Sequence, residues 1–210
     1  MKKILILLFA FISLVSCNQN SNTKPKKEKE NVTPSYTLPF PPGWGTELFS
    51  LPPIFAPAIT YKGVEDIRFA PGWAKAGNND YWTYCFLWYL EDSIQTDATI
   101  IETNLKAYYT GLIASNTQKS KFSTGSIPDT ETTFDKTETA EGDSATFSGT
   151  IRMLDYMKQE PITLNCVVHL KYCPRQKNTY LFHELSPRPF TDSVWKSLDN
   201  IRAGFSCTGK

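Results

Sequence analysis

Apolar residues follow a strand-like pattern in several short segments of this chain. The segment YWTYCFLWYL at residues 81–90 is predicted to be a strand, because aromatic residues crowd it. Both of its alternating sets of side chains are bulky and apolar, so we expect it in the middle of a sheet that is covered on both faces. A shorter strand is predicted over residues 64–69, where VEDIRF runs into a Pro-Gly turn.

Two segments have helical spacing instead. Over residues 96–115, apolar residues recur at intervals of four, three and four, and Thr96 or Asp97 can cap the first turn. Over residues 191–205, Thr191 or Asp192 is the predicted cap, and Gly204 with Phe205 predicts a Schellman ending. The residues expected to face inward are Ile101, Leu105, Tyr108, Leu112, Val194, Trp195, Leu198 and Ile201.

The rest of the pattern predicts two hairpins and a wrapping segment. One hairpin spans residues 131–157 and turns at AEGDS, and the other joins residues 161–173 to 179–185 through PRQKN. Residues 38–60 are rich in proline and are expected to wrap around the domain with little regular structure. This order of elements predicts a single α+β domain, an antiparallel sheet flanked by helices.

Three features of the domain resemble the Mog1/PsbP-like fold family. They are PPGW at residues 41–44, the helix after the long strand, and the closing segment TYLFHELSPRPFTDSVWKSLDNIRAGF. The resemblance is topological and spans most of residues 38–207. It implies an α/β/α layered sandwich with a role in binding or assembly, and it brings no catalytic motif.

The N-terminus predicts export and a lipid anchor. Lys2 and Lys3 precede an apolar run that is too short for a membrane span, which indicates a signal peptide over residues 1–16. The sequence LVSC at residues 14–17 resembles the lipobox of bacterial lipoproteins. That resemblance implies lipid attachment at Cys17 and anchoring in the cell envelope, in the outer membrane rather than the inner one because Asn18 follows the cysteine. An ordinary cleaved signal with a chance cysteine is the alternative.

Composition divides the exported chain into a tether and a domain. Residues 17–37 are polar and read as a flexible tether, while residues 38–210 carry enough apolar residues for one core. The formal net charge of the chain is +1, so no nucleic-acid partner is expected. The partners expected are the membrane, through the lipid anchor, and an unidentified protein or envelope component.

The sequence holds no recognisable catalytic or cofactor motif, so no cofactor is expected. His169 and His183 fall on adjacent predicted strands, and one register places them opposite each other. Cys173 lies four residues beyond His169, roughly 13 Å along a strand, which is too far for one tetrahedral site, so no metal is expected.

Three functional interpretations follow. The first is a non-enzymatic binding or assembly protein whose contact surface is aromatic. The second is an envelope hydrolase or transferase with polar groups converging around His169, His183 and Glu184. The third is a module that binds a glycan or small ligand. The residues proposed for the contact surface are Trp44, Trp73, Phe49 and Phe55, with Phe40 beside them. The alternative is that these aromatic side chains cover the sheet as part of the core, which the rarity of exposed apolar patches on monomers favours.

An exported protein can form disulfides. Cys85 and Cys166 fall in mid-strand, where cysteine acts as a small apolar residue. Cys173 ends its strand, and the terminal helix is expected to return to that end, so a Cys173–Cys207 bridge is predicted from chain direction. Triplets at residues 92–94, 143–145 and 192–194 resemble an O-glycosylation sequon of exported bacterial proteins, although capping and turn chemistry explain them equally well.

Overall fold

The computed structural model describes residues 35–117 and 128–207, and within this part the chain forms seven strands and two helices. The signal peptide, Cys17 and most of the tether lie outside the described residues. The elements are β1 Gly45–Leu51, β2 Gly63–Phe69, β3 Tyr84–Leu90, α1 Ala98–Thr117, β4 Glu131–Lys136, β5 Ala145–Asp155, β6 Glu160–Cys173, β7 Asn178–Ser186 and α2 Ser193–Ala203.

The strands form one antiparallel sheet in the order β1-β2-β3-β7-β6-β5-β4. The predicted α+β class is therefore confirmed. Strand β3 lies inside the sheet between β2 and β7, and every one of its residues is buried, as its two apolar faces predicted. Both predicted hairpins are present as β4–β5 and β6–β7.

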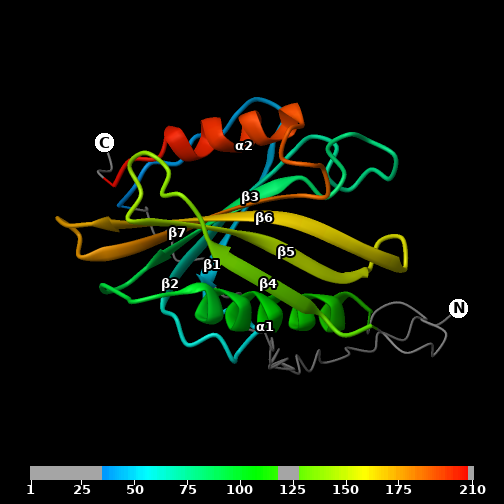
Figure 1. Ribbon diagram of the computed structural model, residues 1–210, viewed down its shortest axis with the longest axis horizontal. Coiled ribbons are helices and arrows are strands. Elements are labelled where there is room, and N and C mark those ends of the chain that lie inside the picture. The colour runs from blue at the N-terminus through cyan, green and yellow to red at the C-terminus, as the bar shows by residue number, and fades with distance from the viewer. Residues whose placement is uncertain (1–34, 118–127, 208–210) are drawn as a thin grey trace, which may run out of the picture. The chain divides into compact units, whose positions relative to one another are not determined.

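The two helices cover opposite faces of the sheet (Figure 1). Phe86 and Trp88 of β3 point into the core under α1, whereas Leu87 and Tyr89 point into the core under α2. Asp97 caps α1 by accepting a hydrogen bond from the Ile100 N–H, and Asp192 caps α2 by accepting from the Val194 N–H. The predicted inward residues are buried, except that Leu112 is only half-buried.

The prediction of little regular structure over residues 38–60 is wrong for β1. The segment GTELFSL contains no proline and pairs with β2 along its whole length. Prolines flank β1 on both sides, outside the residues that pair with β2. At these positions the missing proline N–H removes no hydrogen bond of the sheet, so an edge strand tolerates them.

Two smaller predictions also need correction. Tyr36 and Thr37 were assigned to the tether, but Tyr36 is buried and Thr37 pairs with Ser206, so the fold starts before residue 38. Gly204 has a φ of −84°, so α2 does not end in a left-handed Schellman turn. Glycine is needed there because a Cβ would lie 2.4 Å from Cγ of Pro39.

Candidate functional site

An aromatic pocket opens between α1 and the β1 end of the sheet. Its cavity volume is about 260 Å³. Four regions line it: strands β1 to β3, the two loops that follow β1 and β2, helix α1, and the residue after β5. The lining residues are Glu47, Phe49, Phe55, Ile67, Phe69, Trp73, Tyr84, Tyr108, Leu112, Asn116 and Tyr156.

Strand alternation and ring stacking place these side chains. Phe49 of β1 and Phe69 of β2 occupy positions whose side chains point to the α1 face, and Trp73 folds back from its loop to stack on Phe69, with ring centroids 4.4 Å apart. Phe55 reaches the pocket from the loop after β1 and meets Tyr108 edge-on at 5.1 Å. The walls are therefore fixed mainly by ring-to-ring contacts.

Only two of the lining residues carry a full charge or an amide, and both are exposed. Glu47 lies on the edge strand, and Asn116 lies in the last turn of α1. The pocket therefore has an apolar interior and hydrogen-bonding groups at its exposed side. This arrangement suits a ligand with an apolar body and a polar end.

A buried acid stands behind the aromatic wall. Oε1 of Glu65 accepts a hydrogen bond from the Tyr108 hydroxyl at 2.7 Å, and Oε2 accepts from Nε1 of Trp88 at 3.0 Å. Burial raises the pKa of Glu65 to about 8, although both hydrogen bonds act in the opposite direction. The carboxyl is therefore largely neutral at neutral pH, and it can hold Tyr108 in place without putting a charge into the core.

Three of the four predicted contact residues meet in this pocket. Phe49, Phe55 and Trp73 line it together, and each is half-buried. Trp44 does not join them, because it packs on the opposite face with the α2 core. Phe40 is exposed and lies under the Arg68 guanidinium, 5.6 Å from its centre.

The two histidines do not lie opposite each other. The residue opposite His183 across the hairpin is Val168, so the observed register is shifted by one residue from the one that would pair the histidines. The His169 and His183 side chains therefore point to opposite faces of the sheet. His183 stacks on Phe86 in the α1 core at 4.2 Å, and burial lowers its pKa to about 3. His169 and Glu184 do converge on the α2 face, without His183.

The predicted cysteine pairing is confirmed. Cys173 and Cys207 form a disulfide with Cα atoms 5.7 Å apart, and Cys85 and Cys166 are free and buried. Among residues 35–117 and 128–207 no group of three or more metal-ligating side chains is found.

Sequence reasoning missed part of the pocket. Tyr108 was expected only as an inward residue of the helix, and Tyr156 was assigned no role. The signal available was the concentration of rings in β3 and in the loops after β1 and β2, because aromatic side chains pack favourably against one another.

Comparison with protein-family models, with curated proteins and with solved structures found no match. In the part of the chain that the structure describes, no helix is long and apolar enough to cross a membrane.

Proposed function

We propose that this chain is a non-enzymatic binding protein of the bacterial envelope, and that its aromatic pocket takes a small ligand with an apolar body and a cationic or hydrogen-bond-donating end. The observation that carries the proposal is a ring-lined cavity with the carboxylate of Glu47 on its exposed side. A cavity of about 150 Å³ is enough to hold a benzene ring, so 260 Å³ suits a group of about two fused rings.

The lipobox resemblance at residues 14–17 supports anchoring of this module to the outer membrane through Cys17. Mass spectrometry of the mature N-terminus tests the anchor. We expect an acylated Cys17 as the first residue. A chain that begins at another residue, or a free Cys17 thiol, contradicts the lipoprotein assignment.

The placement of α1 and α2 on opposite faces supports an α/β/α sandwich, and we propose that it is of the Mog1/PsbP-like kind. The resemblance concerns topology alone, so the binding role rests on the pocket.

A naphthalene probe tests the pocket. The full mature chain with Cys17→Ser, which lacks the lipid and therefore does not require detergent, is titrated with 1-naphthylmethylamine while probe fluorescence anisotropy is recorded. We expect saturable binding. Leu112→Trp places a larger side chain in the cavity and should weaken binding at least tenfold.

Ile100→Trp is the matched control, because Ile100 lies on the same helix, is exposed, and does not line the pocket. It should bind the probe as the parent chain does. If Leu112→Trp binds as well as Ile100→Trp, the pocket is not the binding site.

A further inference from the structure

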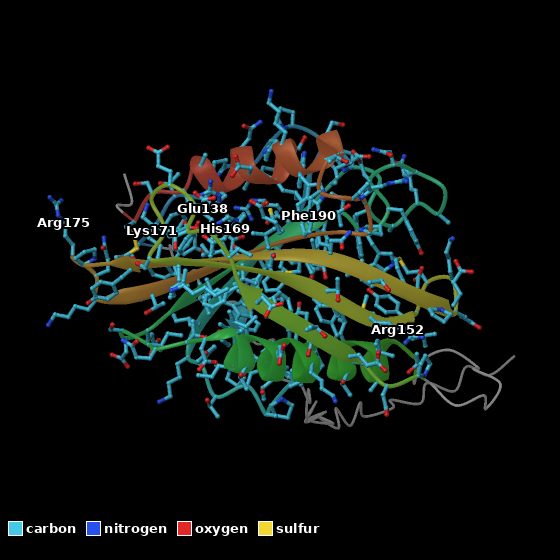
Figure 2. The ribbon with its side chains drawn as sticks, viewed as in Figure 1. Glu138, Arg152, His169, Lys171, Arg175 and Phe190 are labelled. Atoms are coloured by element: carbon cyan, nitrogen blue, oxygen red, sulfur yellow. A yellow bond between two sulfur atoms is a disulfide. The ribbon has the colours of Figure 1, made fainter. Side chains whose placement is uncertain are left out.

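A second hollow lies on the opposite face of the sheet, beside α2. Its volume is about 390 Å³. Figure 2 shows His169 and Phe190 on the side of the sheet that carries α2. The residues that line the hollow are Val167, His169, Glu184, Phe190, Trp195, Lys196 and Asp199.

His169 is held in one orientation at the floor of the hollow. Its Nδ1 lies 2.6 Å from Oδ2 of Asp143, whose side chain is 1% exposed. The Thr146 hydroxyl donates to the same oxygen at 2.7 Å. Because the carboxylate accepts from the imidazole, this contact places a proton on Nδ1 and leaves Nε2 to face the hollow.

Two polar atoms of this floor have no hydrogen-bond partner among the described residues. Nε2 of His169 and Oε1 of Glu184 are buried and make no hydrogen bond. They lie 3.7 Å apart, too far to bond to each other. Their side chains are only 6% and 5% exposed. Since an unpaired buried polar atom is costly, the site is built to receive a polar group.

The charges around the floor disfavour an ionic ligand. The Arg202 guanidinium lies 3.9 Å from Oε1 of Glu184 and 2.6 Å from Oδ1 of Asp199, so it opposes a metal cation. The carboxylates of Asp143 and Asp199 oppose an anion. Burial raises the pKa of Glu184 to about 8, so its carboxyl is able to donate as well as accept near neutral pH.

An aromatic wall completes the hollow. Phe190 is 50% exposed and packs on Trp195 with ring centroids 4.7 Å apart. A neutral ligand that pairs several hydroxyl groups with an apolar C–H face is a sugar. We propose that this hollow is a sugar-binding site, in which adjacent hydroxyl groups bond Nε2 of His169 and Oε1 of Glu184 while the C–H face of the ring lies against Phe190.

Saturation-transfer NMR tests the proposal on the full mature chain with Cys17→Ser. The probes are the methyl glycosides of glucose, galactose, mannose and N-acetylglucosamine, each at millimolar concentration. We expect transfer from protein to ring protons for at least one glycoside. If none of the four receives saturation, the proposal is overturned.

Variants then locate the site. Phe190→Ala alters an exposed side chain and should leave the fold intact while weakening sugar binding at least tenfold. Glu184→Gln should also weaken it. Tyr172→Ala is the matched control, because it removes another exposed aromatic ring of the domain outside the hollow, and it should bind normally.

Leu112→Trp separates this proposal from the function proposed for the aromatic pocket. It should weaken naphthalene binding at least tenfold and leave sugar binding unchanged. If Leu112→Trp removes the sugar signal, or if Phe190→Ala leaves it intact, the sugar does not bind in this hollow and the proposal is overturned.

Discussion

The face of the sheet under α1 and the face under α2 are closed in different ways. Under α1 a large aromatic cluster buries Glu65, whose side-chain hydrogen-bond partners among the described residues are the neutral groups of Tyr108 and Trp88. Under α2 the apolar cluster is smaller, and a network of ionisable groups and a disulfide accompany it.

Neighbouring residues of β7 show what this difference means. His183 and Glu184 are adjacent in sequence, but one points into the ring cluster and the other into the charged network. Burial lowers the pKa of His183 to about 3 and keeps the imidazole neutral. Burial also raises the pKa of Glu184 to about 8, although the Arg202 guanidinium beside it acts in the opposite direction. A sheet covered on both faces can therefore offer an apolar site on one face and a polar site on the other.

The largest expected effect concerns the disulfide. Replacing Cys173 and Cys207 together by alanine releases a loop with a sequence separation of 34 residues and should lower the free energy of unfolding by about 3–4 kcal/mol. Because the bridge joins the end of β6 to the residues after α2, hydrogen exchange should rise more in α2 than in α1. Cys166→Ala, a change in the α1 core, serves as control. Equal exchange in both helices would contradict a role specific to the α2 face.

The second prediction concerns the pH dependence of the α1 core. The ordinary pKa of Glu65 is near 4.5 and its pKa in the fold is about 8. Below pH 4.5 both folded and unfolded chains keep the proton. As the pH rises towards 8 only the unfolded chain releases it, so stability falls, by at most roughly 1.4 kcal/mol per pH unit.

Glu65→Gln should reduce this slope and stabilise the protein at pH 8, because the amide accepts from Trp88 and donates to the Tyr108 hydroxyl. Chemical denaturation at pH 5 and pH 8 measures it. Glu184 titrates in the same range, so Glu65→Gln/Glu184→Gln should flatten the profile further. An unchanged slope in Glu65→Gln means that Glu65 is ionised in the fold.

The third prediction compares one glycine near each helix. A Cβ on Gly111 of α1 would lie 1.9 Å from the Phe55 carbonyl oxygen, whereas one on Gly204 would lie 2.4 Å from a ring atom of Pro39. The Phe55 carbonyl oxygen belongs to the backbone and can move away from an added Cβ less easily than the Pro39 ring can. Overpacking in Gly111→Ala should lower the free energy of unfolding by about 1–3 kcal/mol. The higher helix propensity of alanine should offset about 1 kcal/mol of this loss.

Gly204→Ala should lower the free energy of unfolding by less than Gly111→Ala does. Thermal denaturation of the two variants measures the difference, and the naphthalene probe gives a second readout, since Phe55 lines the aromatic pocket. A larger loss in Gly204→Ala, with probe binding intact in Gly111→Ala, reverses the expected ranking of the two contacts.

The smallest expected effect concerns the exposed Glu47. Glu47→Gln should weaken binding of 1-naphthylmethylamine, which is protonated near neutral pH, by up to about fivefold, since an exposed ion pair contributes at most about 1 kcal/mol. Binding of uncharged 1-methylnaphthalene should not change. If both probes weaken equally, Glu47 shapes the pocket rather than attracting a charge.

Much of the fold was predictable because it depends on local patterns. Rings on both faces of residues 81–90 indicated an inner strand, and the Thr-Asp pairs at 96–97 and 191–192 marked the two helix starts, where the aspartate proved to be the cap in each case. Strand β1 was missed because prolines on both sides hid a short edge strand that forms by pairing with β2.

The sites were less predictable than the fold. Phe49, Phe55 and Trp73 were selected for their aromatic character, but pattern alone did not separate them from Trp44, which packs on the other face. The partner of His169 proved to be Asp143, from one of the sequon-like triplets, because its carboxylate is turned inward to the imidazole. The capping role of Asp192 likewise favours the structural explanation of its own triplet.

The sequence by itself determined the helices, the inner strand, the two hairpins and, through chain direction, the Cys173–Cys207 pairing. The element predictions depend on local periodicity, and the pairing depends on the direction in which successive elements run. Only the tertiary structure decided which rings enclose the pocket and which face each histidine takes. A shift of one residue in strand register moves a side chain to the other face, and register is set by packing of the whole sheet.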